Sequence, residues 1–171
     1  METKKQAAID SKQYLTFMLD REMFAFEVLK VKEVLEVAKI TKVPRTPDFM
    51  PGVINLRGSV VPVVDLRLKF EITAKDRTVD TAIIIVEASF DGDTITIGSL
   101  VDSVHEVIRL DASQIEAPPK VGMNVSGEYI EAIGKKGDDF IIILSADKVF
   151  SEKELAFAKE ASSNDSLSSG E

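Results

Sequence analysis

The chain has 171 residues, with 21 Lys and Arg against 29 Asp and Glu, one His, no Cys and no Trp. This length fits one domain or two small interlocked ones, which can fold without a disulfide or a metal ion. The lack of Cys excludes thiolate metal sites and Cys nucleophiles, and a single His excludes a metal site with two imidazoles. The net charge of −8 disfavours binding to nucleic acid.

The N-terminal segment carries no targeting signal that we can identify. Met1 to Ser11 is polar and lacks the apolar stretch of a signal peptide. No apolar run approaches the roughly 20 residues of a membrane helix. We therefore expect a cytoplasmic protein whose residues 1–12 form a flexible N-terminus.

Short β-branched segments dominate the sequence. Val and Ile together number 34, and they fit a pleated strand better than a helix. Asp91-Gly92 favours a tight hairpin turn, and Pro62 predicts an edge strand or a bulge. Two of the expected strands are apolar on both faces, which is typical of strands enclosed on both sides. In chain order, strands are expected at 14–19, 23–28, 60–64, 81–86, 94–97 and 140–144, the fourth and sixth being the doubly apolar ones.

One helix is predicted near the C-terminus. Ser151 and Glu154 have the spacing of a capping box, and Phe150 and Leu155 have that of a hydrophobic staple. We expect this helix to cover residues 151–161. Residues 162–171 are rich in Ser and poor in apolar side chains, so they are predicted to be disordered.

The sequence also contains a loose internal repeat. The pattern V-x-x-V-x-E-V occurs at Val28–Val34 and again at Val101–Val107, 73 residues later. Proline follows each copy, and then a Gly-containing turn leads into an apolar strand. A duplication that produced two similar β subdomains explains this pattern, and a chance match between Val-rich strands is the alternative.

No constellation of residues supports catalysis. The one imidazole, His105, has Glu106 on the opposite face of an expected strand, so we interpret it as a solvent-facing strand residue. The phosphate-binding, dinucleotide-binding and hydrolase motifs are all missing. Acidic residues that could suggest an ion site or an acid catalyst lie instead at expected hairpin tips, turns or caps: Asp65, Asp91, Asp93, Asp102, Asp138 and Asp139. We expect no enzyme activity, no cofactor and no metal.

The segment from Gly52 to Leu66 is dense in residues with special roles. Gly52 and Gly58 supply backbone freedom, and Asn55 can hold a turn by bonding its own backbone. Arg57 lies beside Gly58 between apolar strands. Its planar guanidinium could anchor a partner or a carboxylate, or its stem could simply cover apolar surface.

This segment resembles the signature of the CheW family, the coupling proteins of bacterial chemotaxis. That signature runs Gly-x-x-Asn-x-Arg-Gly-x-x-x-Pro-x-x-Asp-Leu. All seven of its fixed positions are matched in register, by Gly52, Asn55, Arg57, Gly58, Pro62, Asp65 and Leu66. The similarity extends over residues 13–150, which we expect to be a CheW-like domain with approximate halves 13–80 and 81–150.

The resemblance implies an all-β fold, with two SH3-like β-barrel subdomains around a shared hydrophobic core and a short C-terminal helix. It also implies an adaptor, monomeric when free, that links chemoreceptor tips to the histidine kinase CheA in arrays at the inner membrane. Carried over by position, the receptor-binding residues are Val31, Glu33, Gly52, Arg57, Thr81, Ala82, Val104 and Val107. Asn55, Gly58 and Asp65 are structural turn residues, and the loop from Glu116 to Val121 is the expected kinase contact.

A small β barrel that binds oligonucleotides or another ligand is the alternative function. The acidic charge and the scarcity of stacking aromatics, two Tyr and no Trp, weigh against it.

Overall fold

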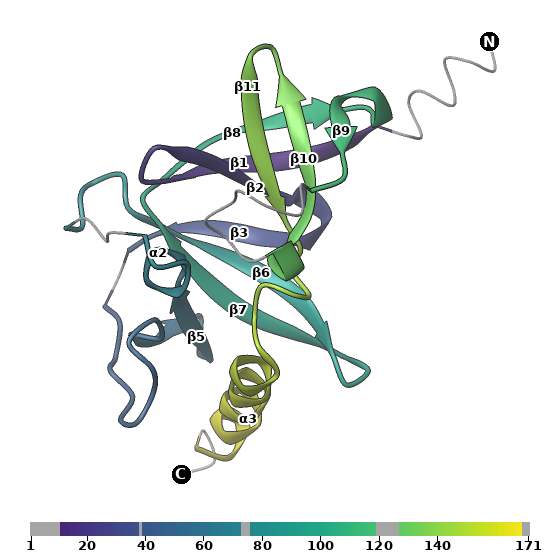
Figure 1. Ribbon diagram of the computed structural model, residues 1–171. Helices are drawn as coiled ribbons and strands as arrows, with labels where there is room; N and C mark the ends of the chain where they lie inside the picture. The colour runs from purple at the N-terminus through teal and green to yellow at the C-terminus, as the bar shows by residue number, and fades with distance from the viewer. Residues whose placement is uncertain (1–10, 38, 73–75, 119–126, 169–171) are drawn as a thin grey trace.

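Figure 1 shows two curled β-sheets and one long helix, drawn from a computed structural model of the chain. The structure describes residues 11–37, 39–72, 76–118 and 127–168, with side chains described as far as Ala161. This architecture confirms the predicted all-β class with a C-terminal helix. No helix among the described residues is long and apolar enough to cross a membrane.

Sheet A contains six strands from the two ends of the domain. Their order across the sheet is β8-β1-β2-β11-β10-β9, with β11 and β2 parallel. The strands are β1 (Lys12–Leu19), β2 (Glu22–Glu27), β8 (Ser103–Leu110), β9 (Ile115–Glu116), β10 (Ile130–Lys136) and β11 (Asp139–Leu144).

Sheet B contains the five strands from the middle of the chain. Their order is β3-β6-β7-β5-β4, with β5 and β7 parallel. The strands are β3 (Val31–Glu36), β4 (Gly52–Leu56), β5 (Ser59–Asp65), β6 (Ala82–Phe90) and β7 (Asp93–Val101). All six strands predicted from the sequence are therefore present in the two sheets.

The two sheets share one topology, which supports a duplication. Apart from the short β9, which ends sheet A, the two orders correspond strand by strand. Sheet A becomes sheet B when β8, β1, β2, β11 and β10 are replaced in turn by β3, β6, β7, β5 and β4. However, β3 follows β2 in the chain and pairs with β6, while β8 follows β7 and pairs with β1. The predicted halves, 13–80 and 81–150, therefore do not each form one sheet, because each half contributes its first two strands, β1 and β2 or β6 and β7, to the sheet that holds the remaining strands of the other half.

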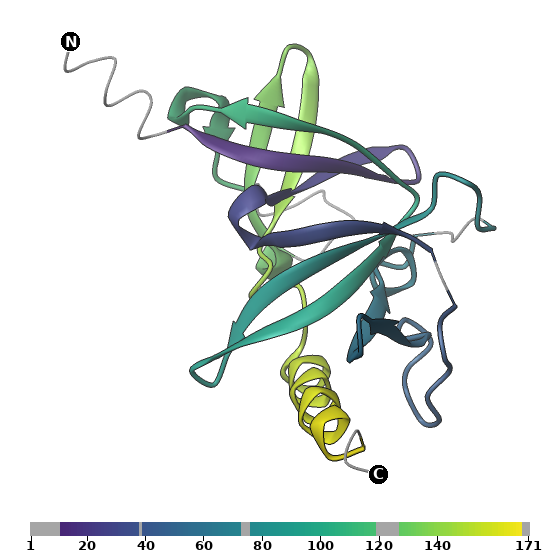
Figure 2. The same cartoon turned by 180° about the vertical axis from the view of Figure 1, so that it is seen from behind.

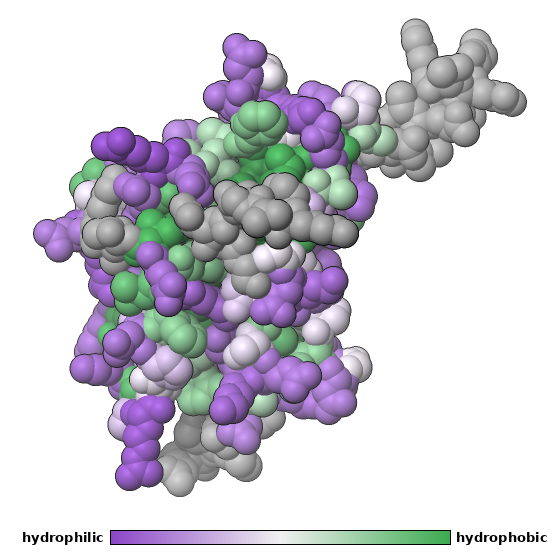
Figure 3. All heavy atoms as spheres, in the orientation of Figure 1, coloured by the Kyte–Doolittle hydropathy of each residue, from purple (hydrophilic) through white to green (hydrophobic). Residues whose placement is uncertain are grey.

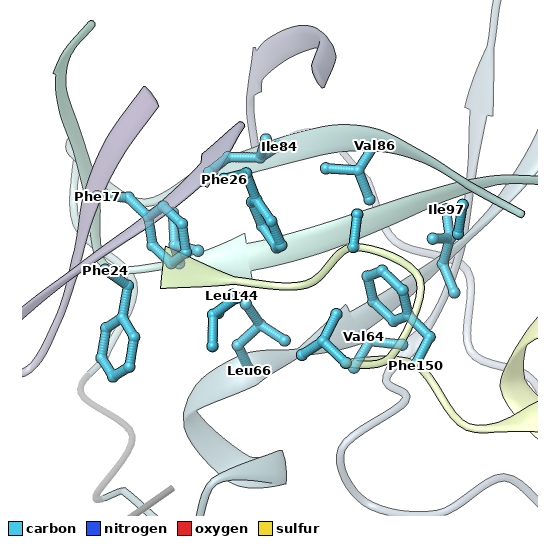
Figure 4. Close-up of a cluster of buried hydrophobic side chains, with 14 of the residues drawn as sticks. Phe17, Phe24, Phe26, Val64, Leu66, Ile84, Val86, Ile97, Leu144 and Phe150 are labelled. Carbon is cyan, nitrogen blue, oxygen red and sulfur yellow. The ribbon is translucent and has the colours of Figure 1, made fainter. Parts of the chain in front are cut away.

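Three hydrophobic clusters explain why strands are apolar on both faces. One cluster lies inside the curl of sheet A, one lies inside the curl of sheet B, and a larger one lies between the sheets. On β6, Ile83 and Ile85 point into sheet B while Ile84 and Val86 point to the central cluster (Figure 4). Burial on both faces fixes the register of such a strand, since a shift by one residue would exchange the two sets.

Pro62 lies in an inner strand, not at an edge. β5 pairs with β4 from Ser59 to Val63, including Pro62 opposite Val53, and it pairs with β7 only from Val63 onwards. The proline, which has no N–H to donate, thus precedes the β7 pairing and interrupts none of it. The predicted edge position is wrong, and no register shift accompanies Pro62 in the pairing with β4.

A buried charge network joins the two sheets. Asp65 caps the short helix α2 (Leu66–Lys69) by accepting from the Arg67 backbone N–H at 3.0 Å. The buried Arg67 side chain donates to Asp65 and also to Asp102, at 3.0 Å. Asp102 in turn accepts from the backbone N–H of Asp20, in the β1–β2 turn of sheet A. Asp65 thus caps α2, and Asp102 lies in the bend between β7 and β8.

The C-terminal helix α3 (Glu152–Ser168) continues the central core. Its predicted capping box is present, since Glu154 N–H donates to the Ser151 hydroxyl and Ser151 N–H donates to the Glu154 carboxylate, both at 3.1 Å. Leu155 and Ala158 are buried in the central cluster. The helix ends seven residues beyond the predicted Ala161, because once a helix is nucleated each added residue gains a backbone hydrogen bond. Ser162–Ser168, predicted to be disordered, is helical.

Candidate functional site

An ion pair between Glu33 and Arg57 defines the candidate site. Glu33 lies on β3 and Arg57 in the β4–β5 turn, and both guanidinium terminal nitrogens bond the carboxylate, one of them at 3.1 Å to Oε1. The hydrogen bond from Arg57 lowers the pKa of Glu33, and Glu33 raises the pKa of Arg57. The Arg57 side chain remains 67% exposed, so a partner can reach it.

Arg57 is held in an unusual backbone conformation. Arg57 and Gly58 form the two-residue loop between the paired residues Leu56 and Ser59, with φ of 51° and 91°. Such turns favour Asn, Asp or Gly at the first position, as at Asp91-Gly92 in the β6–β7 turn, with φ of 51° and 80°. An Arg in this conformation is strained, and such strain clusters at functional sites.

Asn55 and Gly58 meet in the β4–β5 hairpin. The Asn55 side chain accepts from the Gly58 N–H at 2.8 Å, which fixes the turn that presents Arg57. Asp91-Gly92 forms a hairpin tip as expected, as does Asp138, which follows Gly137 between the paired residues Lys136 and Asp139.

Gly52 is buried, and it allows the two edges of sheet B to meet. It is buried at the start of β4, where Thr41 bridges to the neighbouring residue Val53 with two backbone bonds of 2.8 Å. A Cβ on Gly52 would lie 2.0 Å from the Thr41 carbonyl oxygen. Only glycine permits this approach, which joins the chain after β3 to β4 and brings the two edges of sheet B together.

The predicted valines lie on β3 and β8, the corresponding strands of the two copies of the repeat. Val31 on β3 and Val104 on β8 are partly buried and pack against the same central cluster. Val107, also on β8, is 52% exposed and lies opposite Leu15 on β1. Figure 3 shows that hydrophilic residues surround separate apolar patches on one face of the molecule. These valines supply apolar contact area next to charged groups.

Thr81 and Ala82 lie beneath the surface. Both are buried, and Ala82 pairs with Glu36 on β3 and with Val101 on β7. The Thr81 hydroxyl accepts from the backbone N–H of Thr78 at 2.8 Å. The structure thus brings Glu33 and Arg57 into direct contact, whereas Gly52, Thr81 and Ala82 support the strands behind them.

The second copy of the repeat carries a second ion pair. Glu106 on β8 occupies the position of Glu33 in V-x-x-V-x-E-V, and it bonds Lys136 at 3.1 Å. Lys136 precedes Gly137 in the β10–β11 hairpin as Arg57 precedes Gly58. The strand register also shifts at both copies of the repeat. In the pairing of β3 with β6 the shift lies between Val31 and Glu33, and in the pairing of β8 with β1 it lies between Leu15 and Phe17 of β1. His105 beside Glu106 is exposed, as predicted.

The expected kinase contact is described only in part. Glu116 ends β9, is exposed, and pairs with Lys135 at 2.5 Å. Phe140, 65% exposed, lies directly opposite Lys135 on β11. Val121 lies outside the described residues.

Sequence reasoning missed the buried pair that anchors α3. Lys69 of α2 donates to both Glu154 oxygens at 2.5 and 2.8 Å, and each side chain is 5% exposed. The ammonium also lies 5.4 Å from the ring centres of Phe49 and Tyr129. The capping box indicated a second role for Glu154, but nothing local in the sequence indicated that Lys69 lies beside it. No group of acidic or imidazole side chains among the described residues could hold a metal ion.

Comparison with known proteins agrees with this architecture. The chemotaxis protein CheW of Klebsiella aerogenes is 33% identical over 144 residues, which cover 84% of each chain. CheW of Thermotoga maritima is 33% identical over 148 residues, covering 85% of this chain and 91% of that protein.

A solved structure has the same fold. The crystal structure of the scaffolding protein TtCheW from Thermoanaerobacter tengcongensis superposes with a TM-score of 0.75 at 38% identity, covering 84% of this chain and 90% of that one. The family model for the CheW-like domain matches residues 13–154. The chain belongs to the CheW family, and it is a chemotaxis scaffold protein and not an enzyme.

Proposed function

We propose that this protein couples the cytoplasmic tips of chemoreceptors to the histidine kinase CheA, by binding both without catalysis. It acts in the cytoplasm, is monomeric when free, and joins receptor arrays at the inner membrane. The surface that carries the receptor contact is the exposed Glu33–Arg57 pair with the valines of β3 and β8.

The Glu33–Arg57 pair is the observation that supports this proposal most directly. A planar guanidinium held in two hydrogen bonds presents its remaining donors in a fixed direction, which suits a carboxylate on a helical partner. Val31, Val104 and Val107 offer an apolar surface for the partner's helix face. Polar contacts then fix the register while apolar contacts supply affinity.

The kinase contact is assigned to the end of sheet A. Glu116 with Lys135, and the exposed Phe140 beside them, offer an aromatic anchor within a polar rim. Each separate contact can be weak, because repeated contacts in an array add avidity.

A pull-down with a receptor cytoplasmic fragment and CheA tests this function, scored by the kinase activity of the reconstituted mixture. We expect the wild-type protein to bind both partners and to raise kinase activity. R57A should lower receptor binding about tenfold while the far-UV circular dichroism spectrum stays unchanged. A folded R57A variant that binds the receptor as well as wild type would contradict the assigned surface. A wild-type protein that binds neither partner would contradict the function itself.

A further inference from the structure

One end of sheet A contains a small cavity of about 280 Å³. Figure 2 shows this end at the upper left, where the start of β1 lies beside the 3-10 turn η2 (Ala112–Gln114) and β9. Lys12, Ala112 and Glu131 are exposed, so the cavity opens at the surface. Its lining residues come from β1, from η2 and β9, and from β10: Lys12, Tyr14, Ala112, Ile115, Glu131 and Ala132.

Glu131 lines this cavity because β10 carries a β-bulge. Ile130 and Ala132 pair with two successive residues of β11, Leu144 and Ile143, so one residue of β10 is extra. That residue is Glu131. Successive residues of a regular strand point to opposite faces, yet Glu131 and Ala132 line the same cavity. Bulges redirect side chains in this way and are frequent next to functional sites.

The Tyr14 hydroxyl is a second polar group at the cavity. Tyr14 is 3% exposed, and its hydroxyl has no hydrogen-bond partner among the described residues. Within the part of the chain that the structure describes, Ser99 Oγ is the one fully enclosed polar side-chain atom without a partner. The Tyr14 oxygen is therefore not fully enclosed, and it keeps contact with the cavity that Tyr14 lines. A buried hydroxyl without a partner costs free energy, so a ligand that bonds this hydroxyl recovers that cost.

The charges around the Tyr14 hydroxyl favour a cation. Burial, and then the carboxylates of Glu27 and Glu131, raise the pKa of Tyr14 to about 12, so its hydroxyl stays neutral at pH 7. Lys12 lies 3.9 Å from Glu27 and offsets that carboxylate. Glu131 has no ion-pair partner among the described residues, which leaves one uncompensated negative charge at the cavity. The Glu131 carboxylate and the Tyr14 oxygen can both accept hydrogen bonds from a cationic donor.

We propose that this cavity binds an arginine side chain of a partner protein, with the guanidinium on Glu131 and the Tyr14 hydroxyl. A guanidinium has several N–H donors and is weakly hydrated, so it can bond both acceptors at a partly buried site. Its methylene stem would contact the apolar side chains of Ile115 and Ala132, which belong to the cluster inside sheet A. The volume lies just below the roughly 300–1,000 Å³ of small-ligand sites, which suits one side chain better than a whole small molecule.

The test uses the full chain and three blocked tripeptides, acetyl-Gly-X-Gly-amide, in which X is Arg, norleucine or Glu. In an NMR titration the Arg peptide should shift the backbone amide signals of Ile115 and Ala132 to saturation, and the other two peptides should not. E131Q should weaken binding of the Arg peptide about tenfold, and Y14F about threefold, because each removes one acceptor. E152Q removes the same charge from an exposed position on α3 and should leave the affinity unchanged.

K12Q tests the sign of the charge that the cavity prefers. Loss of this ammonium should strengthen binding of the Arg peptide about twofold, because like charges repel, whereas an anionic ligand would bind more weakly. Circular dichroism should show that every variant keeps the fold. Equal binding of the Arg and norleucine peptides, an unchanged affinity in E131Q or Y14F, or weaker binding in K12Q would each overturn the proposal. The cavity lies next to Glu116, but the inference does not rest on the proposed kinase contact, which the pull-down measures separately.

Discussion

Glu33 and Glu106 occupy the same place in two sheets of the same topology, yet their surroundings differ. Each accepts from a basic residue that precedes glycine in a hairpin of its own sheet. In sheet B the donor is Arg57, which bonds both carboxylate oxygens, and in sheet A it is Lys136, which bonds one. A guanidinium gives fixed geometry and an ammonium gives a point charge. Both copies of the repeat therefore have an ion pair between a strand Glu and a hairpin cation. Only the pair in sheet B bonds both carboxylate oxygens, which is the geometry that can recognise a partner from a fixed direction.

The sheets also differ in what covers them. The α3 helix packs on sheet B, against β5, β6 and β7, and sheet A has no such helix among the described residues. Sheet A instead ends in the exposed Phe140 and the Glu116–Lys135 pair. The same topology therefore carries a packed helix on sheet B and an exposed aromatic residue at the end of sheet A.

Of the tests that compare the two sheets, breaking the Lys69–Glu154 pair that anchors α3 should have the largest effect. E154A should lower the free energy of unfolding by about 3–5 kcal/mol, because it leaves Lys69 buried without its counter-ion. Urea unfolding followed by circular dichroism measures the change. E152A, an exposed acidic residue on the same helix, serves as the control and should have little effect. K69M/E154L should recover most of the loss, since it removes both charges. An E154A variant as stable as E152A would show that the pair does not anchor the helix.

The glycines of the two sheets should differ in their tolerance of a methyl group. G52A should lower the free energy of unfolding by about 3 kcal/mol, because its Cβ meets the Thr41 backbone. G134A in β10 should lower it by about 1 kcal/mol, because its Cβ meets the end of the Leu110 side chain, which can move. Thermal unfolding of both variants tests the contrast. Equal losses would mean that sheet B is not held together by the Thr41 bridge.

A binding assay should distinguish the Glu33–Arg57 pair from the Glu106–Lys136 pair. R57A should weaken receptor binding about tenfold, and K136A should leave it within about twofold. Neither change should alter the melting temperature much, since exposed pairs contribute little to stability. Surface plasmon resonance with a receptor fragment measures both variants. An equal loss of affinity in K136A would mean that the two sheets take part alike.

The smallest expected effect is a change in the pKa of Glu33. The Arg57 hydrogen bond lowers the pKa of Glu33 from its ordinary value of 4.5, so the pair contributes fully above that pH and is lost as the pH falls through the lowered pKa. Carboxyl-carbon NMR should place the Glu33 midpoint below the ordinary value in wild type and return it toward that value in R57A. A midpoint that does not move in R57A would contradict the bond.

Local patterns predicted much of the candidate site. The turn at Asn55, Arg57 and Gly58 follows from short-range rules, as does the capping box of α3, because each depends on residues that are neighbours in the chain. The contact between Glu33 and Arg57 could not be derived this way, since 24 residues separate them. Lys69 and Glu154, 85 residues apart, lie together for the same reason, through packing and not through any local pattern.

By itself the sequence determined the strand segments, the turns, the repeat and the lack of catalytic residues, because periodicity, turn chemistry and composition are local properties. Only the tertiary structure decided that β1 and β2 join the strands of the second half, that β6 and β7 join those of the first, and that β5 pairs with β7 only after Pro62. It also decided that Gly52 is needed for closure and not for a surface. These features arise where distant segments compete to bury the same apolar faces, and a strand pairs where that burial is greatest.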